Sequence, residues 1–365
     1  MLQFRTMNGT NTNPDPAPES ILVIRLSSLG DVILATPVIR QLQRTYPDAI
    51  IDVAVREQYG MVYTSNPRVR RVWNVAPSVT ADSDMDNWKL AMLDTVPGGR
   101  YDLVVDLQNN VASTAVRHGL GMHTVKYPKF RMQKLAMVWL KKFPSATTHV
   151  IDRYRMALAN YPLALDTDGP ELWLPEERAS GVYKPDPSRR MHGEQPATGT
   201  LEGLQIGISP GARHFTKRWP AESYGQLCAQ LVRMGARVML VGGTADTDAC
   251  NRVANVAGVP VQRADGATTL DATVRALDAC DVLVGNDSAV MHMAAARRIP
   301  TIAIFGSSVR ELGFTPYGVR YHIVEYNIRC RPCSHIGRQR CPQKHFKCML
   351  MTTPNQVMQA ILKLV

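Results

Sequence analysis

The sequence predicts an α/β protein with two doubly wound, Rossmann-like domains that face each other across a cleft. In both halves of the chain, short runs of branched apolar residues alternate with longer segments of helical pattern. This alternation is typical of parallel sheets with crossover helices. A chain of 365 residues also exceeds the size at which a single core usually stops growing, so two domains are expected.

The first half begins this alternation after a polar stretch. Its expected strands are residues 21–26, 50–55 and 103–107. A helix over residues 32–44 should follow the first strand, although Pro37 should kink it or delay its start because proline has no backbone N–H. We therefore expect a first domain over residues 21–182. Residues 1–20, rich in Asn and Pro, should form a disordered tail.

A change of composition marks the boundary between the halves. Residues 183–203 are rich in Pro, Ser, Gly, Thr and charge and lack apolar periodicity, which is typical of an exposed linker. Residues 204–365 should then form the second Rossmann-like domain. Its expected strands are residues 204–208, 237–241, 282–284 and 301–305.

Composition and motifs narrow the classes of function. A formal net charge of +11 and a pI near 9.4 favour anionic partners such as nucleic acid, phosphorylated metabolites or acidic lipid headgroups. We recognise no nucleic-acid-binding module, no P-loop, and no G-x-G-x-x-G in the loop after the first strand, so dehydrogenases and P-loop enzymes are disfavoured. An odd number of cysteines, no signal-like segment and no apolar run of membrane-spanning length lead us to expect a cytoplasmic protein.

One carboxylate stands where an open α/β sheet places its ligands. Asp31 follows Gly30 at the carboxyl end of the first expected strand. In a cleft it could accept a proton from an attacking hydroxyl, as a general base does. From local sequence alone, an Asp at this position more often caps the following helix through its hydrogen bonds and charge. Both interpretations stay open.

The second half carries a cationic turn after its first strand. The strand leads into a turn at Gly211, and Lys217 and Arg218 come just before a helix expected from residue 221. Backbone amides at a helix N-terminus, together with nearby cations, can hold a diphosphate and stabilise the charge on its leaving oxygen. A solvated basic turn with Trp219 packed as an anchor explains the same residues.

Two further strand ends carry polar residues. Asp287 and Ser288 interrupt an apolar run before a helix, and either can cap it. His292 lies one to two turns into that helix and could reach a bound phosphate, although a lone helical histidine is more often a core or surface residue. After another strand, Asp246 could line a nucleoside pocket or belong to an ordinary loop.

Taken together, these motifs resemble one family closely. They are Ser27-Ser28-Leu29-Gly30-Asp31 with Thr36-Pro37, Lys217-Arg218-Trp219-Pro220, and Asn286-Asp287-Ser288 with His292. In this order they resemble the ADP-heptose:lipopolysaccharide heptosyltransferases of glycosyltransferase family nine, from about residue 21 to the C-terminus. The Lys-Arg-Trp-Pro form is closer to the heptosyltransferase II type. Ala289 departs from the pattern, because the family usually has Gly there.

The resemblance implies a fold of the GT-B type and an inverting transfer of heptose from ADP-heptose to the inner core of lipopolysaccharide. Asp31 would be the general base, and no catalytic metal or other cofactor is implied. The expected donor site contains Gly211, Lys217, Arg218, Asp246, Asp287, Ser288 and His292 in the second domain. The expected acceptor site contains Ser28, Gly30, Gln108, Lys126, Lys129 and Arg131 in the first domain.

The same resemblance implies the partners. The acceptor would be Kdo-lipid A or heptosylated lipid A at the cytoplasmic face of the inner membrane, with no nucleic acid expected. Two alternatives stay open: a family-nine transferase of another sugar, such as an N-acetylhexosamine, and a non-catalytic binder of anionic glycolipid or nucleic acid.

A basic stretch offers a docking surface for such an acceptor. Residues 117–142 contain several lysines and arginines, interspersed aromatic residues and no acidic residue. This stretch could contact phosphorylated lipid A or an anionic membrane surface. An exposed basic helix that only aids solubility fits the pattern as well.

A cysteine cluster lies in the basic segment 329–348. Cys330, Cys333, Cys341 and Cys348 have the spacing C-x2-C-x7-C-x6-C. Four thiolates can enclose a structural zinc ion, although the second half of this spacing is looser than usual. Reduced thiols or a reversible disulfide are the alternatives.

Overall fold

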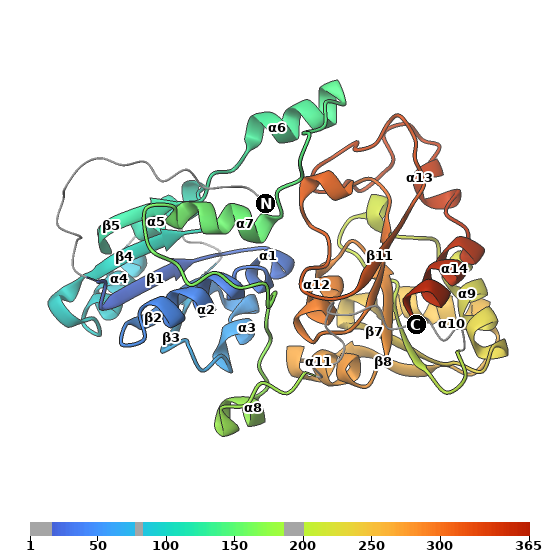
Figure 1. The fold of residues 1–365 in the computed structure, drawn as a ribbon, viewed down its shortest axis with the longest axis horizontal. Helices are drawn as coiled ribbons and strands as arrows, with labels where there is room; N and C mark the ends of the chain where they lie inside the picture. The colour runs from blue at the N-terminus through green and yellow to red at the C-terminus, as the bar shows by residue number, and fades with distance from the viewer. Residues whose placement is uncertain (1–16, 77–82, 186–200) are drawn as a thin grey trace.

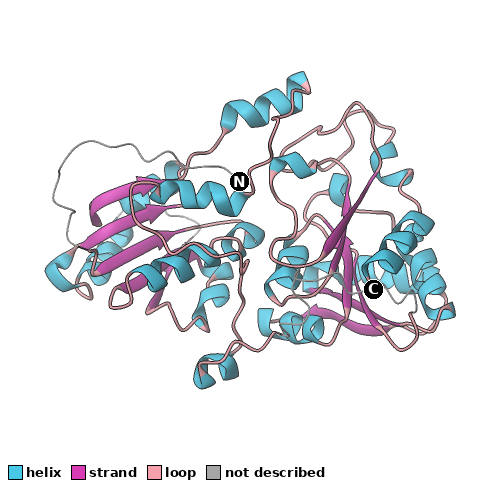
Figure 2. Cartoon of the chain, in the orientation of Figure 1, coloured by secondary structure: helices cyan, strands magenta, loops and turns pink. Residues whose placement is uncertain are grey.

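The computed structural model describes residues 17–76, 83–185 and 201–365. Within them the chain forms two parallel sheets, each with helices on both faces (Figure 1 and Figure 2). Residues 1–16 of the expected tail and 186–200 of the expected linker lie outside the described residues.

The first sheet has five strands in the order β3-β2-β1-β4-β5, and all neighbours are parallel. The strands are β1 (Ser20–Ile24), β2 (Ile50–Arg56), β3 (Arg71–Val75), β4 (Tyr101–Asp106) and β5 (Gly121–Lys126). Its helices are α1 (Leu29–Ile33), α2 (Thr36–Thr45), α3 (Met61–Thr64), α4 (Ser83–Leu93), α5 (Val111–Arg117), α6 (Arg131–Leu135) and α7 (Val150–Arg155). The central strand β1 is buried over its whole length, as expected for a strand covered on both faces.

The second sheet has six strands in the order β11-β10-β9-β6-β7-β8, again all parallel. The strands are β6 (Gln205–Ser209), β7 (Arg237–Gly243), β8 (Gln262–Ala267), β9 (Val282–Asn286), β10 (Thr301–Phe305) and β11 (Tyr321–Glu325). Its helices are α9 (Ala221–Arg233), α10 (Thr247–Ala257), α11 (Leu270–Asp278), α12 (Ala289–Ala296), α13 (Lys347–Leu350) and α14 (Pro354–Leu364).

Both sheets have the strand order of a doubly wound Rossmann fold, which confirms the predicted fold class. In such a sheet the order reverses beside the first strand, and ligands bind outside the carboxyl ends of the strands at that point. The reversal falls between β1 and β4 in the first sheet and between β6 and β9 in the second. These four strand ends therefore define where a site is expected.

The sequence did not predict the outer strands. The strands β3, β5, β8 and β11 carry many exposed or half-exposed residues, so they lack the continuous apolar run that reveals a central strand. The single helix predicted over residues 32–44 was wrong, because the chain forms α1 and α2 with a break around Leu34. Pro37 lies in the first turn of α2, where its missing N–H costs little.

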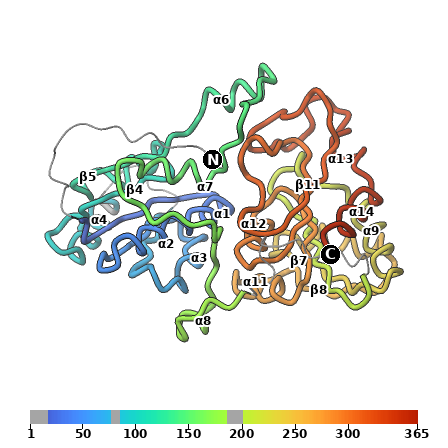
Figure 3. Tube along the Cα trace, in the orientation of Figure 1, coloured from blue at the N-terminus to red at the C-terminus, as the bar shows by residue number. Residues whose placement is uncertain are grey.

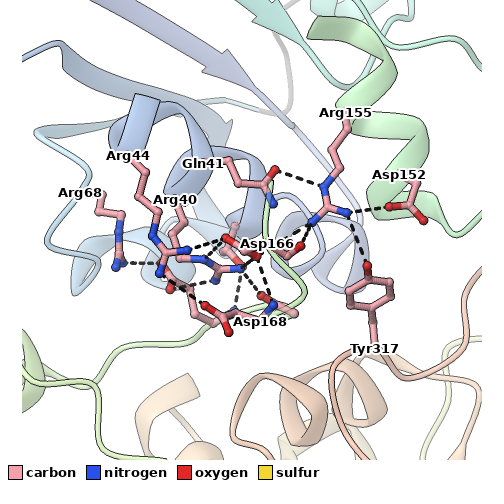
Figure 4. A network of polar contacts seen from close by, with 12 residues as sticks. Arg40, Gln41, Arg44, Arg68, Asp152, Arg155, Asp166, Asp168 and Tyr317 are labelled. Carbon is pink, nitrogen blue, oxygen red and sulfur yellow. Dashed lines mark hydrogen bonds and ion pairs between the residues drawn. The ribbon is translucent and has the colours of Figure 1, made fainter. Parts of the chain in front are cut away.

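The chain crosses between the sheets earlier than the predicted linker. Residues from Asp166 to Glu171 bind first-domain arginines, as Figure 4 shows for Asp166, whose carboxylate pairs with Arg40 at 2.6 Å. Helix α8 (Pro175–Ser180) follows, and its Glu177 pairs with the buried Arg297 of the second domain at 2.9 Å. The crossing segment is therefore fastened to both domains by ion pairs.

The two domains also share an apolar contact. One cluster of buried residues joins Val32 and Ile33 of α1 to Met293 and Ala294 of α12. In Figure 3, α1 and α12 face each other between the two halves, whereas α14 stays with the second domain. No described helix has the length and apolar character needed to span a bilayer.

Candidate active site

A cleft of about 1220 Å³ lies between the domains at the four strand ends named above. It is lined by the segment after β1, Gln108 after β4, Gly211 after β6 and Asp287 after β9. Its volume exceeds the usual range of single-ligand pockets, about 300–1,000 Å³. The cleft therefore has room for parts of two ligands.

Asp31 both caps α1 and faces this cleft. Its carboxylate accepts hydrogen bonds from the Ser28 hydroxyl at 2.9 Å and from the Ser28 backbone N–H at 3.3 Å. The side chain is 20% exposed and lines the cleft. The sequence left open whether Asp31 caps the helix or serves as a base in the cleft. Both positions are compatible, because a capping residue in the first turn of α1 has its carboxylate at the cleft wall.

Two buried residues hold the other carboxylate oxygen of Asp31. Arg25 pairs with Oδ1 at 2.9 Å, and the Tyr154 hydroxyl donates to the same oxygen at 3.1 Å. Burial alone would raise the pKa of Asp31, but Arg25 and the Ser28 and Tyr154 hydrogen bonds hold it below its ordinary value. Asp31 is therefore ionised at neutral pH and fixed in orientation.

The sequence reasoning missed Arg25 and Tyr154. A signal for Arg25 existed, because an arginine directly after the apolar run Ile21–Ile24 must have a partner when it is buried. Tyr154 gave no such signal, because α7 is brought beside α1 only by the tertiary fold.

A second polar cluster lies on the opposite wall, in the second domain. Lys217 pairs with Asp287 at 2.7 Å, and the Ser308 hydroxyl donates a hydrogen bond to the same carboxylate oxygen. Burial would raise the pKa of Asp287, but Lys217 holds it below its ordinary value. The side chain of Lys217 is only 16% exposed and lines the cleft. It is therefore not solvated, as the alternative interpretation of a solvated basic turn would require.

The N-terminus of α12 presents two unpaired polar atoms at this wall. Within the described residues, the Ser288 hydroxyl and His292 Nδ1 are buried without a hydrogen-bond partner, although both side chains line the cleft. Burial lowers the pKa of His292 to about 4, despite the attraction of Asp287 and Asp31 for a proton. A neutral histidine and a free hydroxyl beside a helix N-terminus form a suitable binding site for an anion.

The predicted nucleoside pocket lies further along the same wall. Gly211 and Asp246 are in contact, because a Cβ atom on Gly211 would lie 1.9 Å from Asp246 Oδ1. Asp246 also accepts a hydrogen bond from the Gly243 backbone N–H at 3.0 Å, and burial raises its pKa. Arg218 lines the cleft too and donates through Nε to the Ala212 carbonyl at 2.7 Å.

The first-domain wall is basic. Lys129, Arg131 and Lys134 line the cleft with Gln108, whose side-chain oxygen accepts from the Ser27 backbone N–H at 3.2 Å. Burial and the neighbouring Arg153 lower the pKa of Lys134 to about 8. Lys126, predicted with this group, is instead the exposed last residue of β5 and does not line the cleft. The basic stretch is a strand and a short helix rather than one helix.

The four clustered cysteines lie near one another, since burial and the neighbouring Cys333, Cys330 and Cys341 thiols raise the pKa of Cys348. All four are free thiols, and Cys330 Sγ lies 3.8 Å from His345 Nε2. In the described ranges no three His, Cys, Asp or Glu side chains are arranged to hold a metal ion. Zinc at this cluster therefore stays a prediction, and a tetrahedral site would need four converging ligands. Nearby His335 and Ile336 of the same segment line the cleft.

The fold and site define a class of protein. Two Rossmann domains, with a fixed carboxylate on one wall of the cleft and a lysine beside a helix N-terminus on the other, are the architecture of a GT-B glycosyltransferase. The comparisons agree: residues 90–344 match the model of glycosyltransferase family 9 (heptosyltransferase). The chain belongs to this family and is a glycosyltransferase.

Individual relatives support the same assignment. Lipopolysaccharide heptosyltransferase 2 of Escherichia coli K12 is 30% identical over 308 residues, which are 81% of this chain and 84% of that protein. A family 9 transferase from Veillonella parvula has a similar fold, with a TM-score of 0.73, 20% identity and coverage of 97% and 99% of the two chains. An E. coli heptosyltransferase solved with ADP gives a TM-score of 0.65 at 20% identity, covering 95% and 100%.

Proposed function

We propose that this protein transfers a heptose from ADP-heptose to the anionic inner core of a lipopolysaccharide acceptor, with inversion at the anomeric carbon. The observation that carries the proposal is the position of Asp31 and Lys217 on opposite walls of one cleft, at the strand ends where Rossmann sheets bind ligands. The 30% identity to heptosyltransferase 2 of E. coli favours the second-heptose type of acceptor, a heptosylated lipid A.

The second domain supplies the donor site. The diphosphate would lie against the N-terminus of α12, where the Ser288 hydroxyl and His292 Nδ1 have no partner within the protein. Lys217 would balance the charge that develops on the leaving phosphate. The nucleoside would extend toward Gly211 and Asp246. Support for an adenine nucleotide comes from the related E. coli enzyme solved with ADP.

The first domain supplies the acceptor site. Lys129, Arg131 and Lys134 give this wall a positive charge without an acidic residue between them. Phosphate and carboxylate groups of a lipopolysaccharide core are complementary to such a wall. Ser28, Gly30 and Gln108 would contact the sugar that carries the attacking hydroxyl.

The chemistry follows from these positions. Asp31 accepts the proton of the acceptor hydroxyl, and the oxygen attacks the anomeric carbon on the face opposite the diphosphate. The new C–O bond forms as the bond to ADP breaks, so the configuration inverts. The pair of Arg25 and Tyr154 keeps the Asp31 carboxylate ionised and aimed. Because Lys217 and the α12 amides provide the positive charge at the leaving group, the proposal requires no metal ion.

The test is transfer by the wild-type chain and the Asp31→Asn variant. Each is incubated with ADP-heptose, or with a panel of other nucleotide sugars, and with defined truncated acceptors, and the products are weighed by mass spectrometry. We expect Asp31→Asn to lower kcat by about 10²–10⁴-fold while ADP affinity stays within about twofold. Asp152→Asn is the matched control, because this half-exposed carboxylate on α7 pairs with Arg155 and does not line the cleft. Full activity of Asp31→Asn would refute the base assignment.

A second experiment tests the donor site by comparing ADP binding of two variants with that of wild type. Lys217→Met leaves the buried Asp287 carboxylate without its cation, whereas Ser308→Ala removes only a hydrogen bond from it. We expect Lys217→Met to weaken ADP binding by about 10- to 100-fold and Ser308→Ala by less than about tenfold, measured by calorimetry. Equal affinities for all three proteins would exclude this wall as the diphosphate site.

A further inference from the structure

One segment near the cleft is attached on one side and exposed on the other. We call residues 129–143 the cleft arm; it contains α6 and the π-helical turn Ala136–Leu140. In Figure 1, α6 stands out from the rest of the protein above the gap between the two halves. One side of the cleft arm packs against the protein and the other side is exposed to solvent. This difference suggests a role beyond connecting β5 to α7.

The inner side of the cleft arm is fixed to the protein. Met137 is 1% exposed and packs against Val309 and Leu312 of the second domain. Lys141 donates from Nζ to the carbonyls of Pro332 at 2.8 Å and Cys330 at 3.2 Å. These contacts hold the arm against the second domain, and Arg131 and Lys134 of its inner side line the cleft.

The outer side exposes large apolar side chains. Met132 is 79% exposed, Trp139 72%, Leu140 65% and Phe143 46%. With Leu135, which is 47% exposed and lines the cleft, five exposed apolar side chains lie within twelve residues of one short segment. Isolated exposed apolar residues are common, but such a cluster marks a contact surface. Such a surface is typical of a site that binds a partner.

Charge identifies the partner. No acidic residue occurs from Leu107 to Ile151, while the cleft arm itself contains Lys129, Arg131, Lys134, Lys141 and Lys142. Exposed Trp, Leu, Met and Phe beside lysines and arginines are the composition of segments that lie in the interface of an anionic bilayer. A protein partner would need a matching acidic and apolar surface, whereas a membrane of anionic lipids offers both over any area.

We infer that the cleft arm docks the protein on an anionic lipid bilayer through Met132, Trp139, Leu140 and Phe143. This rests on the proposed function for its purpose, because the arm that lies on the membrane also lines the acceptor wall. A lipid-anchored acceptor could then place its sugar in the cleft while its acyl chains stay in the bilayer. The arm would thus hold the cleft and Asp31 next to the lipid surface.

The experiment measures vesicle binding by the full chain without donor or acceptor. Wild type, Trp139→Ser/Leu140→Ser and Leu165→Ser/Val256→Ser are sedimented with vesicles of phosphatidylcholine alone or mixed with phosphatidylglycerol. Leu165 and Val256 are 63% and 42% exposed, so the second pair also removes exposed apolar surface, but away from the arm. We expect wild type and this control to bind the phosphatidylglycerol vesicles, and the arm variant to bind about tenfold more weakly.

The salt dependence of vesicle binding and the self-association of the protein provide further tests of the docking surface. Binding should fall at high salt, because part of it is electrostatic. Equal binding by all three proteins, or binding to neither vesicle, would overturn the inference. Wild-type self-association that the arm substitutions abolish, without vesicle binding, would assign the surface to a second copy of the chain instead and also overturn it.

Activity distinguishes this inference from the proposed function. The arm variant should transfer sugar to a soluble, lipid-free acceptor at the wild-type rate but lose about tenfold on an acceptor embedded in vesicles. If neither the wild type nor any variant transfers heptose, but vesicle binding still depends on the arm, the proposed function is refuted and the docking surface is supported. Loss of transfer to the soluble acceptor in the arm variant would show damage to the site rather than lost docking.

Discussion

Gly30 of α1 lies directly against His292 of α12 where the two domains meet. A Cβ atom on Gly30 would be 3.0 Å from His292 Cδ2 and 3.7 Å from the Cα atom of Ala289. The helix that carries Asp31 and the helix whose N-terminus carries the proposed anion site are thus in contact with no spare room. The separation of the two walls depends on this contact.

Gly30→Ala should therefore impair transfer more than folding. The added methyl group must displace His292 or move α1, and misplacement by a fraction of an ångström at reacting groups is costly. We expect kcat/KM to fall by about 10- to 100-fold in a steady-state transfer assay. Gly285→Ala is the control, since its methyl group would meet Ser209 Cβ at an ordinary 3.4 Å and does not line the cleft. Similar activities of the two variants would show that the contact is not critical.

Tyr154→Phe should change the pH dependence of the reaction. The Tyr154 hydroxyl stabilises the ionised form of Asp31, so its loss should raise the pKa of that carboxyl toward its ordinary value. The acidic limb of kcat/KM should move to higher pH by about one to two units, because a hydrogen bond to a charged group is worth about 1.5–3 kcal/mol and one pKa unit is about 1.4 kcal/mol.

A second tyrosine gives the control for this measurement. Tyr63 is also buried, but its hydroxyl donates to the Val32 carbonyl at 2.8 Å and not to Asp31. Tyr63→Phe should leave the acidic limb in place. If the Tyr154→Phe profile overlays that of wild type, Asp31 does not govern the limb.

The sequence was sufficient for the central strands and the local motifs, and insufficient for relations between distant segments. The buried apolar runs of β1, β9 and β10 were readable because a strand covered on both faces has few polar residues. The half-exposed β5 and β11 lack that signal. Asp31 and Lys217 were found from their place at strand ends, where open sheets bind ligands.

Residues that act through tertiary contacts were out of reach. Tyr154 lies 123 positions after Asp31 in the sequence, and no local pattern connects the two residues. Lys126 was wrongly grouped with Lys129 because both belong to one basic stretch, yet β5 ends at Lys126 and leaves it outside the cleft. The cysteines are close in sequence and lie near one another in the fold, but their spacing could not decide whether they hold a metal ion, and the described residues contain no group of three such ligands arranged to do so.

The cysteines give a prediction about thiol reactivity and metal removal. Cys330, Cys333 and Cys341 are partly exposed, whereas Cys228, Cys250, Cys280 and Cys348 are buried. Burial raises the pKa of both Cys228 and Cys250 to about 12, so these two stay protonated and unreactive. A thiol reagent should label about three sites in the native protein and all seven after unfolding. EDTA should not change the native count. An EDTA-dependent increase would show that a bound metal protects the cluster.

His292 gives a prediction about stability against pH. Its pKa is about 4 in the folded protein and about 6.5 in an unfolded chain, so the folded state favours the neutral form. Between these values the unfolded state binds more protons, and stability therefore falls as pH decreases below 6.5. From pH 7 to pH 5 this single group should cost about 2 kcal/mol of the free energy of unfolding.

His292→Asn should remove that contribution, so its free energy of unfolding in urea should fall less than that of wild type between pH 7 and pH 5. The carboxyls of Asp31 and Asp287 do not confuse this comparison, because their pKa values are lowered and they titrate below the range. Burial also lowers the pKa of His149, to about 3, so part of the wild-type slope should persist in the variant. His123→Asn, on the exposed face of β5, should retain the full slope. Parallel curves for His292→Asn and wild type would mean that His292 is not held neutral in the folded protein.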